Sequence, residues 1–146
     1  MTMVELLMVV GIIGLLSVIL VPAVKKAFEY KENSEVAHKL RTAIQAFELY
    51  RSEEGRYPPD KNPGITPVGM AEFFGYFDID WWAEVTEIGG KFDWDNGYNF
   101  PYSVSIHAPT KPQSQLEDLD KMIDDGNLAT GDFRAVGNHY HYILEE

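Results

Sequence analysis

The chain of 146 residues contains no cysteine. This absence excludes a disulfide framework, thiol catalysis, cysteine zinc sites and covalently attached haem. Basic side chains are also scarce, because 12 Lys and Arg stand against 23 Asp and Glu and the formal net charge is -11. So acidic a protein repels phosphate backbones, and we therefore expect no nucleic acid among its partners. Calcium or a basic partner surface would complement this charge better.

The N-terminal part of the chain lacks charge of either sign. Residues 6–24 carry no ionisable side chain, and Ser17 is their only polar residue. As a helix, this run would span about 29 Å, close to the roughly 30 Å hydrocarbon core of a bilayer. It therefore predicts a membrane-spanning helix. A secretory signal peptide is the alternative, but it requires a basic start, and no Lys or Arg precedes Lys25.

Glu5 stands immediately before this apolar run. A carboxylate at the bilayer centre costs about 2.5–3.5 kcal/mol, and an ionisable group in such a setting indicates a paired, functional residue. The sequence therefore raises the question of which positive group pairs with Glu5.

The helical pattern continues beyond the apolar run. Apolar residues recur three or four positions apart from residue 36 to residue 50, opposite a charged face. Gly55, followed by Pro58 and Pro59, predicts the end of the helix near residue 54, with the glycine as a left-handed cap. The face predicted to be buried consists of Val36, Leu40, Ala43, Phe47 and Tyr50.

Three helix-breaking residues, Gly11, Gly14 and Pro22, lie inside the predicted helix. A proline in a helix removes one hydrogen bond and clashes with the carbonyl four residues back. One hypothesis is a kink, which membrane helices tolerate. The other is a segment that melts and extends when the anchor leaves lipid for a protein environment. The residues themselves leave both open.

The rest of the chain predicts a small mixed domain. We expect a short helix over residues 70–77 and β-structure over 89–110, with a turn at Asp95, Asn96 and Gly97. Ser114 and Glu117 fit a capping box, which opens a helix that closes at Gly126. Residues 133–136 and 140–144 predict a hairpin. The expected fold class is α+β: one long N-terminal helix, apolar in its first half and amphipathic in its second, packed on a small antiparallel sheet.

The first 23 residues resemble the N-terminus of mature type IV pilins and of the pseudopilins of type II secretion. A second, shorter match covers residues 54–58, which are similar to the helix-ending segment of major pseudopilins. Met1 departs from the family, which usually has Phe there. The short basic leader of the family is absent, so we expect the numbering to start at the processed end. The matching positions near the N-terminus are Thr2, Glu5, Leu6, Leu7, Val10, Ile12, Ile13, Gly14 and Pro22.

The resemblance implies a structural function. Members of the family are made in the inner membrane and are trimmed and N-methylated, here at Met1, by a prepilin peptidase. Assembly machinery then extracts them into an extracellular or periplasmic filament of identical subunits. The carboxylate of Glu5 would pair with the amino terminus of Met1 on a neighbouring subunit. Residues 1–25 would then form the membrane segment and filament core, and residues 26–146 the head.

Two other functions stay open at this point. The lack of cysteine and residues 54–58 favour the head of a major pseudopilin of type II secretion over that of a pilus. A membrane-anchored binding domain that stays monomeric is a third possibility. No serine or carboxylate has a recognisable activating partner, so we expect no catalytic residue and no enzyme.

Two groups of residues suggest metal ligands. Acidic residues flank Gly97 and Gly126, but neither group has the spacing of an EF-hand, and turn chemistry explains them more simply than Ca²⁺ does. His139 and His141 alternate on one predicted strand, with His107 possible as a neighbour. We expect solvated histidines and no bound metal. The acidic groups are Asp93, Asp95 and Asn96, and Asp124, Asp125 and Asn127.

Overall fold

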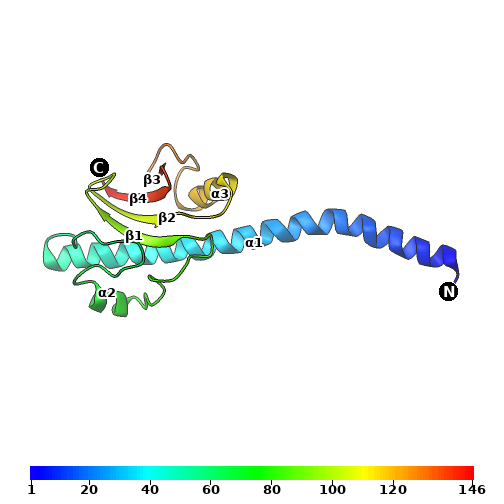
Figure 1. Cartoon of the computed structure of the whole chain (residues 1–146), viewed down its shortest axis with the longest axis horizontal. Helices are drawn as coiled ribbons and strands as arrows, with labels where there is room; N and C mark the ends of the chain where they lie inside the picture. Colours follow the sequence, from blue (N-terminus) through cyan, green and yellow to red (C-terminus); the bar gives the residue numbers. More distant parts are fainter. The chain divides into compact units, whose positions relative to one another are not determined.

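The computed structural model describes all 146 residues. The chain divides into two compact units, Met1–Glu32 and Asn33–Glu146, and helix α1 contributes residues to both. Figure 1 shows the order of the elements along the chain. Their bounds are α1 (Met3–Glu54), α2 (Ala71–Tyr76), β1 (Lys91–Asn96), β2 (Tyr102–His107), α3 (Gln113–Ile123), β3 (Phe133–Val136) and β4 (His139–Glu145).

The strands form one antiparallel sheet in the order β1-β2-β4-β3. On β1 and β2, Phe92 lies opposite Ile106 and Trp94 lies opposite Val104. All four of these side chains are buried. Because side chains alternate along a strand, they share one face of the sheet, and Asp93 and Asp95 project from the other. The sheet therefore has an apolar face and a polar face.

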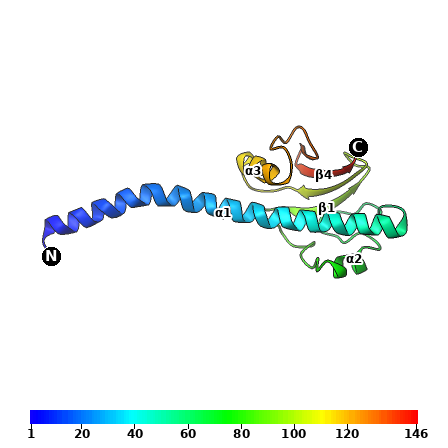
Figure 2. The same ribbon diagram turned by 180° about the vertical axis from the view of Figure 1, so that it is seen from behind.

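The apolar face packs on the second half of α1. The ring of Phe47 stacks on Trp94, with centroids 4.1 Å apart and planes inclined by 10°, and meets Phe74 of α2 edge-on at 5.8 Å. Figures 1 and 2 show the strands and α2 on opposite sides of this part of α1. The helix is thus the central layer of the head, which confirms the predicted α+β, pilin-like architecture.

The buried face of α1 is the one that the periodicity predicts. Val36, Leu40, Ala43 and Phe47 have no exposed surface, and Tyr50 is also buried. The helix ends at Glu54, and Gly55 takes the left-handed conformation with φ of 70° while its N–H donates to the carbonyl of Arg51. The predicted glycine cap is confirmed.

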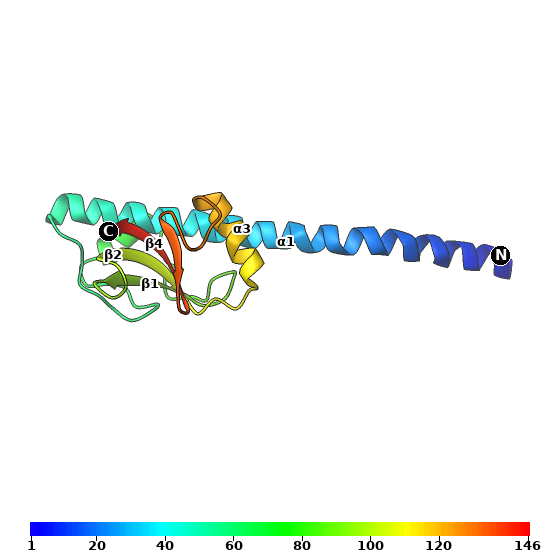
Figure 3. The same ribbon diagram turned by 90° about the horizontal axis from the view of Figure 1, so that it is seen from above.

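Helix α3 covers one end of the head. Figures 1 and 3 place it at the end of the sheet away from the C-terminus. The buried side chain of Asn33 donates to the carbonyl of Gln115, and Arg41 donates to the carbonyl of Met122. Gln115 Nε2 also donates to Asn33 Oδ1 at 3.4 Å. Three hydrogen bonds therefore tie α3 to α1, and all come from polar side chains that the helical pattern did not single out.

The predicted capping box at Ser114 and Glu117 is wrong. Helix α3 begins at Gln113, its N-cap is Pro112, and no side chain caps it. Ser114 therefore lies inside the first turn, two positions after the N-cap, where its side chain does not cap the N-terminal amides. The helix also ends at Ile123, three residues before the predicted Gly126. The short helix α2 and the β3–β4 hairpin form as predicted.

The Met1–Glu32 unit is helical from Met3 onward and buries none of its apolar run. Every residue from 1 to 28 is exposed. The helix passes Gly11, Gly14 and Pro22 without a break. These residues are thus compatible with helix in the single chain, and whether the segment melts on leaving the membrane stays a hypothesis.

Replacing Phe47 by alanine should lower the free energy of unfolding of the head by about 3–5 kcal/mol, because it removes the stack on Trp94 and leaves a cavity. Urea unfolding of the full chain in detergent micelles, followed by tryptophan fluorescence, measures this loss. Phe28→Ala is the matched control, since Phe28 lies on the same helix and is 62% exposed. It should change stability by less than about 0.5 kcal/mol. Equal losses in both variants would contradict this core.

Candidate functional site

The first candidate site is the apolar half of α1. By length and composition, α1 is the one helix of the structure that is able to cross a membrane. Its large apolar side chains between residues 3 and 24 are 43–80% exposed. A surface this apolar is stable in lipid or against other apolar helices and unfavourable in water. The structure therefore supports membrane anchoring by this segment.

Glu5 has a partner within its own chain. The N–H of Thr2 donates to Glu5 Oε2 at 3.0 Å, and the N–H of Glu5 donates to Thr2 Oγ1 at 3.2 Å. This reciprocal pair is a capping box that satisfies two amides at the start of α1. The spacing Thr2-x-x-Glu5 is a readable signal for it, which our sequence analysis missed because it treated Glu5 only as a charge.

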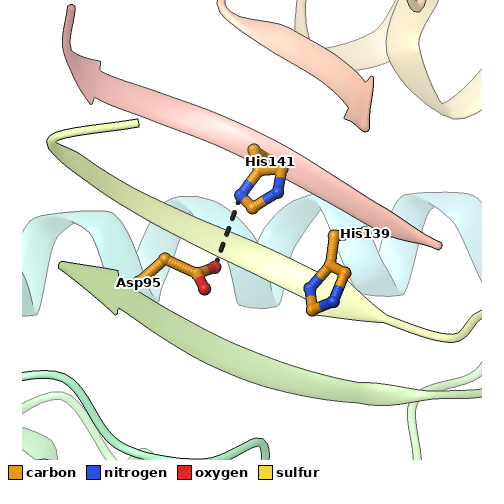
Figure 4. A group of neighbouring side chains, drawn as sticks. All are labelled: Asp95, His139 and His141. Carbon is orange, nitrogen blue, oxygen red and sulfur yellow. Dashed lines mark ion pairs between the residues drawn. The ribbon is translucent and has the colours of Figure 1, made fainter. Parts of the chain in front are cut away.

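The second candidate site lies on the polar face of the sheet. It consists of Asp93, Asp95, His107, His139 and His141, which we call the outer-face cluster. Figure 4 shows Asp95, His139 and His141 projecting from the face opposite to α1. The strand registers place His107 opposite His139 and Ser105 opposite His141. Three strands thus bring together side chains that are up to 48 positions apart in the sequence.

His141 is the buried centre of this cluster. It has no exposed surface, and its Nδ1 lies 2.9 Å from Ser103 Oγ and 3.3 Å from Asp95 Oδ2. Its Nε2 lies 3.0 Å from the amide nitrogen of Asn99. Because an amide nitrogen only donates, Nε2 is the acceptor and the proton sits on Nδ1, facing Asp95. The prediction that His141 is solvated is wrong, since the loop that carries Asn99 covers it.

Asp95 is held as a carboxylate. Ser105 Oγ donates to its Oδ2 at 2.5 Å, and the same oxygen faces His141. Burial raises the pKa of Asp95, but the hydrogen bonds from His141 and Ser105 outweigh this and keep the pKa below its usual value. Asp95 lies in strand β1 and not in the predicted turn. Turn chemistry therefore does not explain the position of this carboxylate.

His139 and His107 form a pair of imidazoles. His107 Nδ1 lies 3.0 Å from His139 Nε2, so one ring donates and the other accepts. The Nδ1 of His139 is buried and has no hydrogen-bond partner. Burial first, and then the neighbouring His107, lower the pKa of His139. His139 is therefore a neutral imidazole at pH 7, and one of its ring nitrogens has no hydrogen-bond partner.

Asp93 is the second incompletely satisfied member of the cluster. It is 4% exposed, and its Oδ1 accepts no hydrogen bond. Burial, together with the charges of Asp95 and Asp60, raises the pKa of Asp93 to about 7. Asp93, Asp95, His107 and His139 all contribute to the wall of one surface cavity of about 250 Å³. Such a wall of carboxylates and imidazoles is able to ligate a cation.

A third group, at the end of α3, is purely acidic. Asp124 Oδ2 accepts from the N–H groups of Asp132 and Phe133, and Asp125 accepts from Asn127 N–H and Thr130 Oγ. These bonds confirm that turn chemistry organises the loop.

Asp120, which we did not predict from the sequence, completes this acidic group. It is fully buried, and neither of its oxygens accepts a hydrogen bond of normal geometry. Ligand oxygens of Asp120, Asp124 and Asp125 lie within 4.8 Å of one another, and hard cations such as Ca²⁺ prefer such donors. Helical spacing is the sequence signal for it, because Asp120 stands four residues after the buried Leu116 and shares its face of α3, whereas the exposed Asp118 does not.

Stability should depend on pH through Asp120. Burial, then the charges of Asp125 and Asp124, raise its pKa from 3.8 to about 6. The native state thus holds this proton more tightly than the unfolded chain, so its contribution to stability is complete below pH 3.8 and is lost as the pH rises through 6. Asp120→Asn should therefore be more stable than wild type at pH 7.5, by about 1–3 kcal/mol, and equal to it at low pH.

Urea unfolding at a series of pH values, with a chelator present, measures this difference. Asp118→Asn is the control on the same helix, because the Asp118 side chain is 58% exposed. A stability difference between wild type and Asp120→Asn that is the same at every pH would contradict the assignment.

Comparison of the chain with family models, with curated proteins and with solved structures found no match.

Proposed function

We propose that this chain is the structural subunit of a helical filament of the type IV pilus kind, assembled through its N-terminal helix. The observation that carries the proposal is the apolar segment of α1, which is exposed along its whole length and begins at an ionisable residue. Before assembly the segment anchors the subunit in the inner membrane. In the filament the same segments of many subunits pack together as the core, with the heads outside.

Hydrophobicity alone does not select a filament over a membrane. Burying one Leu or Ile side chain contributes about 1.5–3 kcal/mol relative to water, but lipid supplies this gain as well as a helix bundle does. A specific polar contact is needed to favour the bundle and to set its register. We assign this contact to Glu5 and the amino terminus of Met1 on a neighbouring subunit, since both would otherwise be charged and alone in an apolar core.

The capping box is compatible with this pairing and prepares it. The N–H of Thr2 occupies Glu5 Oε2, and an ionised carboxylate has acceptor sites left on both of its oxygens. Thr2 therefore holds the carboxylate against the first turn of α1 while Oε1 stays available to a neighbouring amine. Met1 itself is 96% exposed, so its amino group is accessible to another subunit.

The major pseudopilin of a type II secretion system is the second candidate, and residues 54–58 favour it. Tyr57 is buried against Trp94 at 5.3 Å between centroids, and the carbonyl of Pro58 accepts hydrogen bonds from Trp94 Nε1 and Asn96 Nδ2. The segment that resembles major pseudopilins is thus an integral part of the head. Both candidates use the same assembly contact and differ in the length and location of the filament.

Glu5→Ala should abolish or strongly reduce filaments while leaving membrane insertion intact, because Met1 of the neighbouring subunit loses its partner. Glu5→Gln separates charge from capping, since Gln still completes a capping box; it should fail to assemble as well. Thr2→Ala keeps the charge and loses only the cap, at about 0.5–2 kcal/mol of helix stability, and should retain filaments. Membrane fractionation and electron microscopy of sheared filaments measure the two properties.

The result for Glu5→Gln decides whether assembly depends on the charge of Glu5 or on its capping role. Normal filaments in this variant would remove the proposed ion pair and leave only the capping role. Filaments lost in Thr2→Ala but kept in Glu5→Gln would assign assembly to helix capping instead.

A further inference from the structure

The outer-face cluster has a feature that a purely structural polar network lacks. Two of its buried atoms, His139 Nδ1 and Asp93 Oδ1, have no hydrogen-bond partner. A buried polar atom left unsatisfied costs about 1–3 kcal/mol. Both residues contribute to the wall of the same cavity, together with Asp95. A ligand that satisfies an imidazole nitrogen and carboxylate oxygens at once is a metal ion.

We infer that the outer-face cluster binds one divalent transition-metal ion of the Zn²⁺ type, through His139 Nδ1 and the carboxylates of Asp93 and Asp95. Asp95 accepts its hydrogen bonds from Ser105 and His141 on Oδ2, and neither of these bonds uses Oδ1. These three protein ligands leave a further position to water from the cavity, as in open zinc sites. The site is independent of the filament contact, which lies in the other compact unit of the chain.

His107 and His141 orient the proposed ligands and do not themselves bind the ion. A metal-bound histidine usually donates its other ring N–H to a neighbouring acceptor, which fixes its tautomer. His139 Nε2 is placed for this role, 3.0 Å from His107 Nδ1. His141 uses both nitrogens, one on Asn99 and one on Ser103 and Asp95, so it orients the Asp95 carboxylate.

Distance and charge favour the same ion. The ligand atoms of Asp95 and His139 lie within 4.8 Å of each other, and two ligands of one zinc ion with bonds of about 2.0–2.2 Å lie at most about 4.4 Å apart. A small side-chain rotation therefore brings these two ligands onto one ion, and Asp93, which contributes to the wall of the same cavity, turns toward them to complete the set. Asp60, Asp93 and Asp95 lie around the cavity with Lys61 as the nearby cation, so a divalent ion reduces the repulsion among the carboxylates. An imidazole donor selects transition metals over Ca²⁺, which prefers oxygen.

Calorimetric titration of the full chain in detergent micelles with ZnCl₂, after treatment with a chelator, tests this inference. We expect one ion per chain, bound at least about tenfold more weakly after His139→Ala or Asp93→Asn, and about tenfold to a hundredfold more weakly after His107→Ala. His38→Ala is the matched control, because His38 is exposed on α1, and it should bind like wild type. Excess Ca²⁺ should not compete.

A second measurement does not require a variant to fold. Titration of the wild-type chain with paramagnetic Co²⁺ should shift the imidazole NMR signals of His107, His139 and His141 and leave those of His38 in place. The inference is overturned if no ion binds, or if His139→Ala binds as tightly as wild type. It is equally overturned if Asp120→Asn abolishes the binding, because the ion would then occupy the acidic loop after α3.

Discussion

One half of α1 has no partner within its own chain, and the rest of the account depends on this constraint. The apolar side chains of residues 3–24 are exposed. Their contact with water costs a free energy of about 25 cal/mol per Å² of apolar surface. The segment must therefore lie in lipid or against other helices. Since the two environments are almost equally apolar, a small polar contact is able to decide between them. We propose that Glu5 makes this contact, and Thr2 holds its carboxylate in place.

The second half of the same helix packs against other elements of its own chain. Phe47 lies between the sheet and α2, with Trp94 on one side and Phe74 on the other. The resulting core leaves the opposite face of the sheet free to carry polar residues. That face is buried as well, because residues of two loops, among them Asn62 and Asn99, lie over or beside it. The head thus has an apolar core on one face of its sheet and a buried polar cluster on the other.

Local patterns predicted the elements whose cause is local. The spacing of Val36, Leu40 and Phe47 identifies the buried face of α1, and Gly55 marks its end, because helix period and glycine conformation act within a few residues. The alternation of Phe92 and Trp94 likewise identifies the apolar face of the sheet. The capping pattern was less reliable: it fails at Ser114, where Pro112 starts the helix earlier, and it holds at Thr2.

The candidate sites were only partly readable, since they depend on contacts between distant segments. Asp95 was expected in a turn because Asn96 and Gly97 follow it, and His141 was expected in solvent because an antiparallel sheet usually has one solvated face. Strand pairing and the loop at Asn99 bury them instead. The spacing of Asp120, four residues after Leu116, predicts its burial on α3, but not the two carboxylates that the following loop brings to it. The apolar run of the N-terminal segment is readable from the sequence. The assembly that we propose from it, however, involves contacts with a second chain.

Sedimentation of the native protein, sheared from cells without detergent, tests the central claim most directly. The account predicts rapidly sedimenting polymers in which residues 1–25 are protected from proteases and the heads are accessible. Lone molecules that stay in the supernatant without lipid or detergent, with the N-terminal helix open to cleavage, would contradict it.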